Sequence, residues 1–219
     1  GSKENISCDS LGISGGWTPA VHLFTQSGGK LKFRDDDQVF IPNTYPSNQI
    51  SIGSCNGDFT LDEILINTPK LLKEFLNIKK TEYENIEIYS SFNKSKRNIW
   101  LLPSNKIVGK TKSFVDFQND ATAKDIKLAL REGFRSIEHV KRYTTTGMGT
   151  DQGKLGNMHA LGIISETASS KMGELGTTTF RPPYTPLTFG TIVGRNVGKY
   201  FDITRKTPIH EGHVKNKAE

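Results

Sequence analysis

Three short helical patterns between residues 122 and 166 constrain the fold of this chain more than any other feature of the sequence. They cover 122–131, 136–142 and 157–166, and a glycine-rich turn at 144–156 separates the last two. Thr122 and Asp125 have the spacing of a capping box, with Asp in place of the usual Glu. Helices this short are stable only when their apolar faces pack together, so the pattern predicts a small three-helix domain.

The first 78 residues combine brief strand patterns with glycine turns. We expect strands at 6–14, 31–33 and 39–41, a strand end at 50–57, and a short helix at 19–26 with Thr18 as its cap. A longer helical spacing covers 60–76, and we expect Pro69 to interrupt it. A helix amino end carries N–H groups without helical partners, so a phosphate would fit near 58–61. The alternative is that the glycines before this helix serve only tight packing.

The composition favours more than one structural piece. An apolar fraction of 34% is lean for one dense core in a chain of 219 residues. The segment 79–110 is polar, and Trp100 is its predicted docking residue, whereas residues from 173 onward are rich in Thr, Gly and Pro. The predicted divisions are therefore 1–78, a linker at 79–110, the helical domain at 111–172 and an extended arm at 173–219.

Charge and residue usage exclude several classes of partner. The net charge is +6, but basic and acidic residues are interleaved, so we expect no nucleic-acid partner. No apolar run approaches the roughly 18 residues of a membrane span, and the two cysteines, Cys8 and Cys55, indicate a reducing, cytoplasmic setting. The histidines considered as metal ligands lack completing acids or thiols, so we assign no metal. They are His139, His159, His210 and His213.

Several strings of sequence together carry a resemblance to a known family. They are CDSL at 8–11, SGGWTPAVHL at 14–23, VDFQND at 115–120, EGFRSIEHVKRYTT at 132–145, GMGTDQGK at 147–154 and TFRPPYTP at 179–186. Through these strings the chain resembles the alpha subunit of heterotetrameric sarcosine oxidase. The resemblance runs from late Rossmann strands, through a central helical domain, to the start of a folate-binding aminomethyltransferase-like domain. Only 79–104 carries little of it.

The resemblance implies a mixed fold of class α/β plus α. Its parts would be the C-terminal portion of a two-dinucleotide-type Rossmann domain, a linker, a small three-helix domain and an extended arm. The family oxidises sarcosine to glycine, forms hydrogen peroxide and passes the one-carbon unit to tetrahydrofolate. Its alpha subunit binds NAD, its beta subunit carries FAD and the amine site, and FMN lies between the two. Gamma and delta subunits complete the assembly.

The resemblance also implies two groups of cofactor contacts in this chain. The late Gly-Asp turn of such Rossmann domains reads Gly53-Ser54 here, and the predicted NAD contacts are Ser54, Phe59 and Leu61. The loop before the third helix concentrates cations, hydroxyls and glycine N–H groups, which suits the FMN phosphate. The predicted FMN contacts are Lys141, Arg142, Thr144, Thr145, Thr150, Gln152 and Lys154. For this loop, the alternative is a capped turn whose charges are solvated. For residues 53–61, the alternative is a fold element that no longer holds a cofactor.

Two departures from the family pattern shape these expectations. The first Rossmann strand and its glycine-rich pyrophosphate loop do not occur in the sequence, so we expect weak NAD binding by the chain alone. Related amine and opine dehydrogenases carry four iron–sulfur cysteines, and the corresponding positions here read Asp116, Gln118, Asp151 and Gly156. Without thiolates we expect no iron–sulfur cluster. We assign no catalytic residue and expect the chain alone to be inactive on sarcosine.

Two other functions remain open at this point. The chain could be an interaction module that recruits a flavoprotein without holding a cofactor. It could also belong to an amine or opine dehydrogenase, as one of its subunits, although that family's cysteines are absent.

Overall fold

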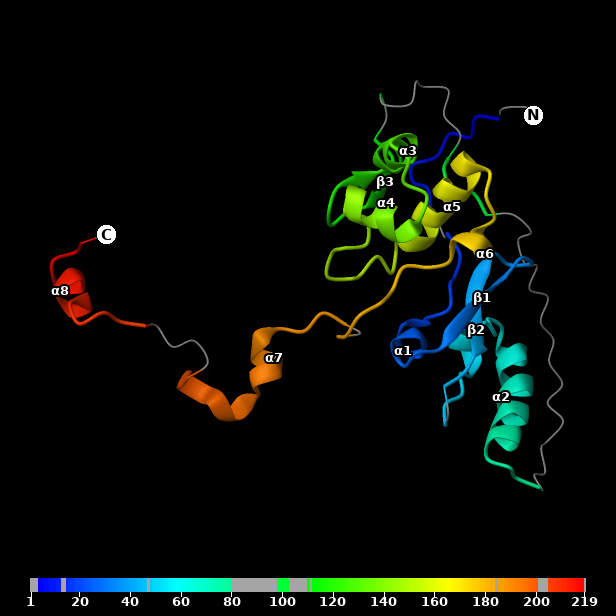
Figure 1. Ribbon diagram of the computed structural model, residues 1–219, viewed down its shortest axis with the longest axis horizontal. Coiled ribbons are helices and arrows are strands. Elements are labelled where there is room, and N and C mark those ends of the chain that lie inside the picture. The colour runs from blue at the N-terminus through cyan, green and yellow to red at the C-terminus, as the bar shows by residue number, and fades with distance from the viewer. Residues whose placement is uncertain are drawn as a thin grey trace. The chain divides into compact units, whose positions relative to one another are not determined.

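A computed structural model describes residues 4–12, 15–46, 48–79, 98–102, 110, 112–183, 185–200 and 205–218 (Figure 1). The chain divides into two compact units, Gly1–Tyr184 and Thr185–Glu219. The predicted divisions at 78/79, 110/111 and 172/173 stay predictions. In the described part of the chain, no helix is long and apolar enough to cross a membrane.

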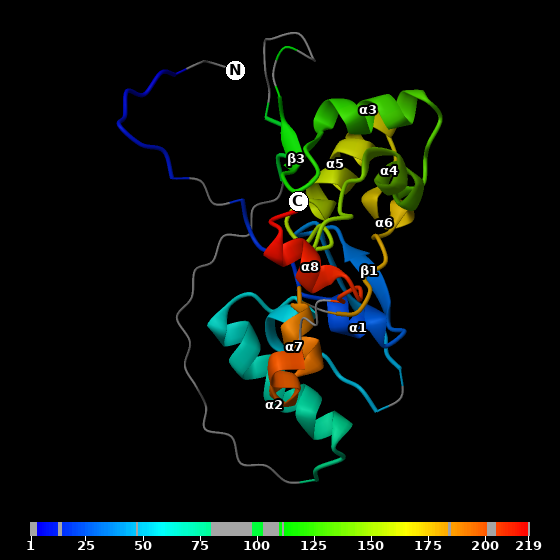
Figure 2. The same ribbon diagram turned by 90° about the vertical axis from the view of Figure 1, so that its left-hand side faces the viewer.

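Three helices form the centre of the first unit, as the sequence predicts. They are α3 (Ala123–Arg131), α4 (Ile137–Thr144) and α5 (Asn157–Ala168), and they lie together in both views (Figures 1 and 2). The Thr122 side chain accepts a hydrogen bond from the Asp125 N–H, and the Asp125 carboxylate accepts one from the Thr122 N–H, which confirms the predicted capping box. Gly133 follows α3 with a φ of +98°, a conformation that favours glycine.

The core of this unit draws on more than the three helices. Its fully buried side chains come from α3, α4 and α5: Ile126, Val140, Leu161, Ile163 and Ile164. Phe40, from an antiparallel hairpin of β1 (Lys30–Arg34) and β2 (Val39–Thr44), belongs to the same cluster. Met172 joins it from α6 (Met172–Leu175). Burying each such side chain contributes about 1.5–3 kcal/mol, so the hairpin and the helices are stabilised as one body.

The hairpin confirms the predicted strands at 31–33 and 39–41, but other N-terminal predictions are wrong. Residues 4–12 form no strand, and Ile6 is 77% exposed. The expected strand end at 50–57 is instead an unpaired segment followed by the short 3₁₀ helix η1 (Gly53–Asn56). An apolar pattern forms a strand only where a neighbouring strand supplies hydrogen-bond partners, and the described residues supply none here.

Both predicted N-terminal helices exist, with different limits. Helix α1 (His22–Gln26) begins three residues after Pro19, and its N-cap is Val21 rather than Thr18. Helix α2 (Leu61–Phe75) runs through Pro69 without interruption. A proline inside a helix costs about 3 kcal/mol. The capping box of Thr60 with Glu63 stabilises the amino end of α2 and offsets part of this cost.

The strand pairing leaves the Rossmann classification a prediction. In the described residues, β1 pairs with β2, and β3 (Phe114–Asp116) pairs with β4 (Ala121–Thr122), both in antiparallel orientation. The mixed α/β class itself is confirmed.

The second unit consists of short helices with exposed apolar side chains. It contains α7 (Phe189–Val193), the 3₁₀ segment η2 (Arg195–Tyr200) and α8 (His210–Lys215), and none of their residues is buried.

Trp100 docks on the helical core, as predicted for the linker, most of which lies outside the described residues. Its indole ring packs against Gly162, and a Cβ built on Gly162 would overlap that ring.

We therefore expect Gly162→Ala to destabilise the chain by about 1–3 kcal/mol through overpacking. In a Trp100→Ala background the same change is expected to stabilise α5 by up to about 1 kcal/mol, because alanine is the better helix former. Urea unfolding of the four proteins in this cycle measures both values. An equal effect of Gly162→Ala in the two backgrounds would contradict the contact.

Candidate functional site

The loop between α4 and α5, where FMN contacts were predicted, is held in place by the buried carboxylate of Asp116. Oδ2 accepts a hydrogen bond from the N–H of Gly147 at 2.7 Å, and Oδ1 accepts one from the N–H of Gln118 at 2.8 Å. Asn119 donates through its N–H at 3.1 Å and its side-chain amide at 3.4 Å. Burial by itself would raise the pKa of Asp116, but these hydrogen bonds outweigh it and lower the pKa. Asp116 is therefore an ionised acceptor that joins the loop to β3.

Asp116, Gln118, Asp151 and Gly156, the positions that the sequence analysis compared with iron–sulfur cysteines, make contacts that order the loop. Besides Asp116, Gln118 accepts a hydrogen bond from the Thr150 hydroxyl at 3.2 Å, and Asp151 accepts one from the Gly153 N–H at 2.9 Å. Gly156 lies so close to β3 that a Cβ there would overlap the carbonyl oxygen of Val115. Segments 115–118 and 147–156 are thus joined by hydrogen bonds and close packing.

Two of the predicted FMN contacts already have internal roles. The buried Thr144 hydroxyl donates to the Val140 carbonyl at 2.8 Å and pairs with the Thr146 hydroxyl. The Gln152 side chain forms hydrogen bonds with the backbone of residues 181–183, near the end of the first unit. Its amide nitrogen donates to the carbonyls of Arg181 at 2.6 Å and Pro183 at 3.1 Å, and its oxygen accepts from the Arg181 N–H at 2.7 Å.

The other predicted FMN contacts divide between the surface and a cavity. Arg142, Thr145 and Thr150 are exposed, and half-buried Lys141 lies 3.9 Å from the Glu138 carboxylate. Lys154 lines a cavity together with His22, and Arg142 does not belong to that lining. Arg142 and Lys154 therefore have different surroundings, and their joint contact with an FMN phosphate stays a prediction.

His22 is a residue of this region that the sequence analysis did not single out. It is 8% exposed, and its ring lies 4.0 Å from that of Phe180 between centroids. Burial, and secondarily the positive charge of Lys154, lower the pKa of His22 to about 4. Its imidazole is therefore neutral near pH 7. The signal that could have identified it was its position in the family string at 14–23.

The predicted NAD contacts lie around the amino end of α2. Ser54 is exposed in η1, Phe59 is half-buried, and Leu61 is 70% exposed at the first position of α2. The N–H groups of Phe59 and Thr60 donate to the Glu63 carboxylate at 3.0 and 3.1 Å. This end of the helix is therefore capped by its own carboxylate, which does not suit a phosphate.

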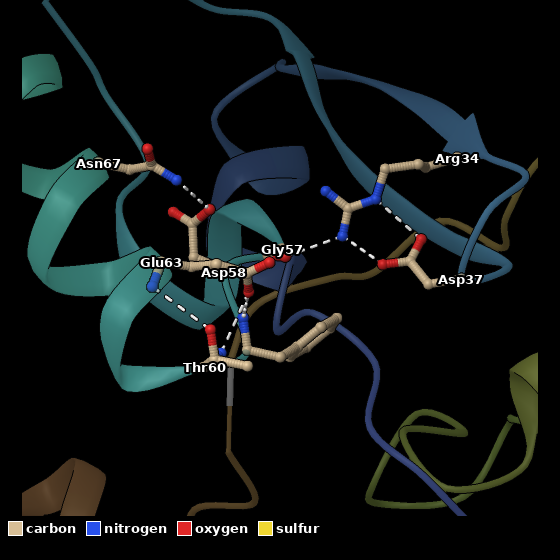
Figure 3. Close-up of polar contacts among 8 residues, drawn as sticks. Arg34, Asp37, Gly57, Asp58, Thr60, Glu63 and Asn67 are labelled. Atoms are coloured by element: carbon tan, nitrogen blue, oxygen red, sulfur yellow. Dashed lines mark hydrogen bonds and ion pairs between the residues drawn. The ribbon is translucent and has the colours of Figure 1, made fainter. Parts of the chain in front are cut away.

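A second set of polar contacts ties this turn to the hairpin. Arg34 donates to the Asp37 carboxylate and, at 2.8 Å, to the carbonyl of Gly57, while Asn67 donates to buried Asp58 at 2.9 Å (Figure 3). The hydrogen bond that Arg34 donates to the Asp37 carboxylate raises the pKa of Arg34. Acidic groups and their partners thus surround the turn, and a pyrophosphate placed here would meet like charge.

Comparisons with known proteins identify relatives along the whole chain. Residues 110–195 match the sarcosine oxidase A3 domain family. The sarcosine oxidase alpha subunit of Rhizobium meliloti strain 1021 is 36% identical over 223 residues, which span 100% of this chain and 22% of that protein. The alpha subunit of Corynebacterium strain U-96 is 33% identical over 227 residues, 100% of this chain and 23% of that protein. The chain thus spans less than a quarter of the length of these relatives.

Two further similarities are narrower. An opine oxidase subunit of Rhizobium meliloti strain 1021 is 33% identical over 73 residues, which are 33% of this chain and 16% of that protein. The solved structure of L-proline dehydrogenase from P. horikoshii superposes with a TM-score of 0.51 at 22% identity, over 82% of this chain and 38% of that one. The latter similarity concerns the fold alone.

Proposed function

Since the chain is homologous along its whole length to sarcosine oxidase alpha subunits, we propose that it is a non-catalytic, cofactor-holding part of such a protein. The relatives are oxidoreductase subunits, so the proposal includes partner subunits of the beta, gamma and delta types. The assembly would oxidise sarcosine to glycine with formation of hydrogen peroxide. FAD and tetrahydrofolate would bind elsewhere in it.

The observation that carries the proposal is the loop at 144–156, which lies inside the matched A3 domain. Asp116 and the glycine contacts hold this loop against β3. Arg142, Thr145 and Thr150 present a cation and two hydroxyls at its surface. These groups are suitable donors for the phosphate of an FMN bound between this chain and a beta-type partner. The flavin supplies the electron transfer, and the chain's residues orient it.

For NAD, the proposal is limited to contacts at exposed Ser54 and Leu61, with Phe59 behind them. The capped amino end of α2 does not fit the pyrophosphate, which would need donors from outside this chain. NAD binding by the chain alone is accordingly expected to be weak.

The visible spectrum of the complex purified through this polypeptide from its native source tests the proposal. We expect flavin absorption, and acid extraction should release FMN that chromatography identifies. A colourless complex would favour the interaction module instead. Broad iron–sulfur absorption would favour the dehydrogenase-type function, for which the partial similarity to the opine oxidase protein is the supporting observation.

A further inference from the structure

Large apolar side chains are exposed around the loop between α4 and α5. Phe117 is 77% exposed, Met148 is 55% exposed and Leu155 is 82% exposed. The ring of Phe114, which is also exposed, packs on the Phe117 ring with 5.7 Å between the centroids. Single exposed apolar side chains are common on proteins, whereas several in one region mark a surface that contacts another molecule. We call Phe114, Phe117, Met148 and Leu155 the apolar patch.

Phe117 and Met148 lie on two segments that are in direct contact. The Gly147 N–H donates to the Asp116 carboxylate at 2.7 Å, so the residues just before Met148 and Phe117 are hydrogen-bonded to each other. The residues just after them also touch, because a Cβ at position 149 would overlap the side chain at position 118. Phe117 and Met148 are therefore neighbours on two joined segments.

Leu155 belongs to the same region of the first unit. It precedes Gly156, where a Cβ would overlap the carbonyl oxygen of Val115, two residues before Phe117. These contacts fix the backbone that carries the patch. A partner can therefore bind the patch without a large cost for ordering the loop.

The groups around the patch are polar and exposed. They are Gln118, Asn119, Thr145 and Thr150, with Arg142 in the last turn of α4. Aromatic and methionine side chains at the centre, with a polar rim that includes an arginine, are the composition of a protein–protein interface. A small ligand would instead require a concave site that encloses most of its surface. The exposed patch therefore suits the surface of another protein.

The patch is continuous with the surface to which the proposed function assigns the FMN phosphate. The Met148 N–H donates to the Thr145 carbonyl at 3.1 Å, and the Thr150 hydroxyl donates to Gln118, next to Phe117, at 3.2 Å. In the proposed function, a beta-type subunit covers the flavin at this surface. The same subunit would then reach the patch.

We propose that the apolar patch is the surface on which a beta-type partner subunit docks. The partner presents an apolar surface to it, and Phe117 and Leu155, as the most exposed members, are the central contacts. The identity of the partner rests on the proposed function. The inference itself concerns assembly of the subunits, whereas the flavin contact concerns retention of FMN, so the two can fail separately.

Hydroxyl-radical footprinting of the complex purified from its native source tests the inference without any variant. We expect Phe117, Met148 and Leu155 to be oxidised several-fold more slowly in the complex than after the partner has been dissociated. Protection that persists without the partner would overturn the inference, because another part of the polypeptide would then cover the patch. Protection that is lost when only the flavin is extracted, or that occurs in a complex of copies of this chain alone, would overturn it as well.

A triple variant then assigns the contact to these side chains. Phe117→Ser with Met148→Ser and Leu155→Ser is expected to lower the amount of copurified partner by about tenfold or more. Thermal unfolding of the chain should stay unchanged, because the replaced side chains are exposed. The matched control is Ile6→Ser with Leu11→Ser, which removes two apolar side chains of similar exposure and should leave assembly intact. Undiminished partner content in the folded triple variant would contradict the docking surface.

Arg142→Ala separates this inference from the proposed function. It should lower the flavin content while the partner stays bound, whereas the triple variant should lose the partner itself. If the triple variant loses flavin but keeps the partner, the docking surface is wrong and the FMN contact stands. If the complex holds no flavin and the triple variant still loses the partner, the docking surface stands and the FMN contact is wrong.

Discussion

The double variant Arg142→Ala with Lys154→Ala is expected to release FMN from the assembled complex while the subunits stay together. The FMN phosphate carries close to two negative charges that must be matched where an interface excludes water. Each charge-assisted hydrogen bond contributes about 1.5–3 kcal/mol, so losing two corresponds to roughly a hundredfold or more in affinity. Arg142 lies in the last turn of α4, and Lys154 lies three residues before α5, so the two residues flank the loop between these helices.

Flavin content per complex, measured after gel filtration, checks this expectation. The control is Lys124→Ala with Arg131→Ala, which removes one Lys and one Arg from exposed positions of α3. The single variants Arg142→Ala and Lys154→Ala show how much of the flavin loss each residue causes. Because Lys154 lines the cavity with His22, a loss confined to Arg142→Ala would assign the phosphate to the loop surface alone. Unchanged flavin content in the double variant would contradict the FMN contact and show that the loop is only a structural turn.

The second large effect is expected at Asp116, where Asp116→Asn should destabilise the chain by about 2–4 kcal/mol. The carboxylate accepts hydrogen bonds from the N–H groups of Gly147, Gln118 and Asn119. An asparagine has one acceptor oxygen, so its NH₂ group must face at least one of these donors. Hydrogen bonds to a charged group contribute about 1.5–3 kcal/mol, and a buried unpaired donor costs about 1–3 kcal/mol. The urea midpoint measures the loss.

Asp120→Asn is the matched control, because Asp120 is exposed in the same turn. Its φ of +51° suits asparagine, so we expect a change within about 0.5 kcal/mol. A similar midpoint for Asp116→Asn and Asp120→Asn would show that the Asp116 carboxylate does not hold the loop.

The pH dependence gives an independent test of the Asp116 effect. Because hydrogen bonding lowers the pKa of Asp116 in the folded state, its stabilisation is present above the ordinary value of about 3.8 and is lost as the pH falls through the lowered pKa. The stability difference between the unmodified chain and Asp116→Asn should therefore shrink at pH 2–3. His22 affects the stability over a different pH range. Its unfolded form takes up a proton between pH 6.5 and about 4, which lowers the stability of both proteins equally.

Features that depend on neighbouring residues could be predicted from the sequence. The Thr122–Asp125 capping box joins residues three positions apart, and the hairpin around its acidic turn joins strands that are adjacent in sequence. The family strings similarly identified the sarcosine oxidase relationship, and the comparisons confirm it. The sequence also showed that cysteines are absent at 116, 118, 151 and 156. It did not show that Asp116 and Gly156 organise the loop at those positions.

The remaining features were decided by tertiary contacts. Residues 4–12 have a strand-like pattern but no described strand beside them, and α2 continues past Pro69 despite the local cost of a proline inside a helix. The sequence did not show that Lys154 lines a cavity with His22, more than 130 positions earlier in the chain. Local sequence determines caps, turns and helix faces because those interactions join residues that are only a few positions apart in the chain. Which side chains meet in a cavity depends on how distant elements pack, and only the tertiary structure decides that.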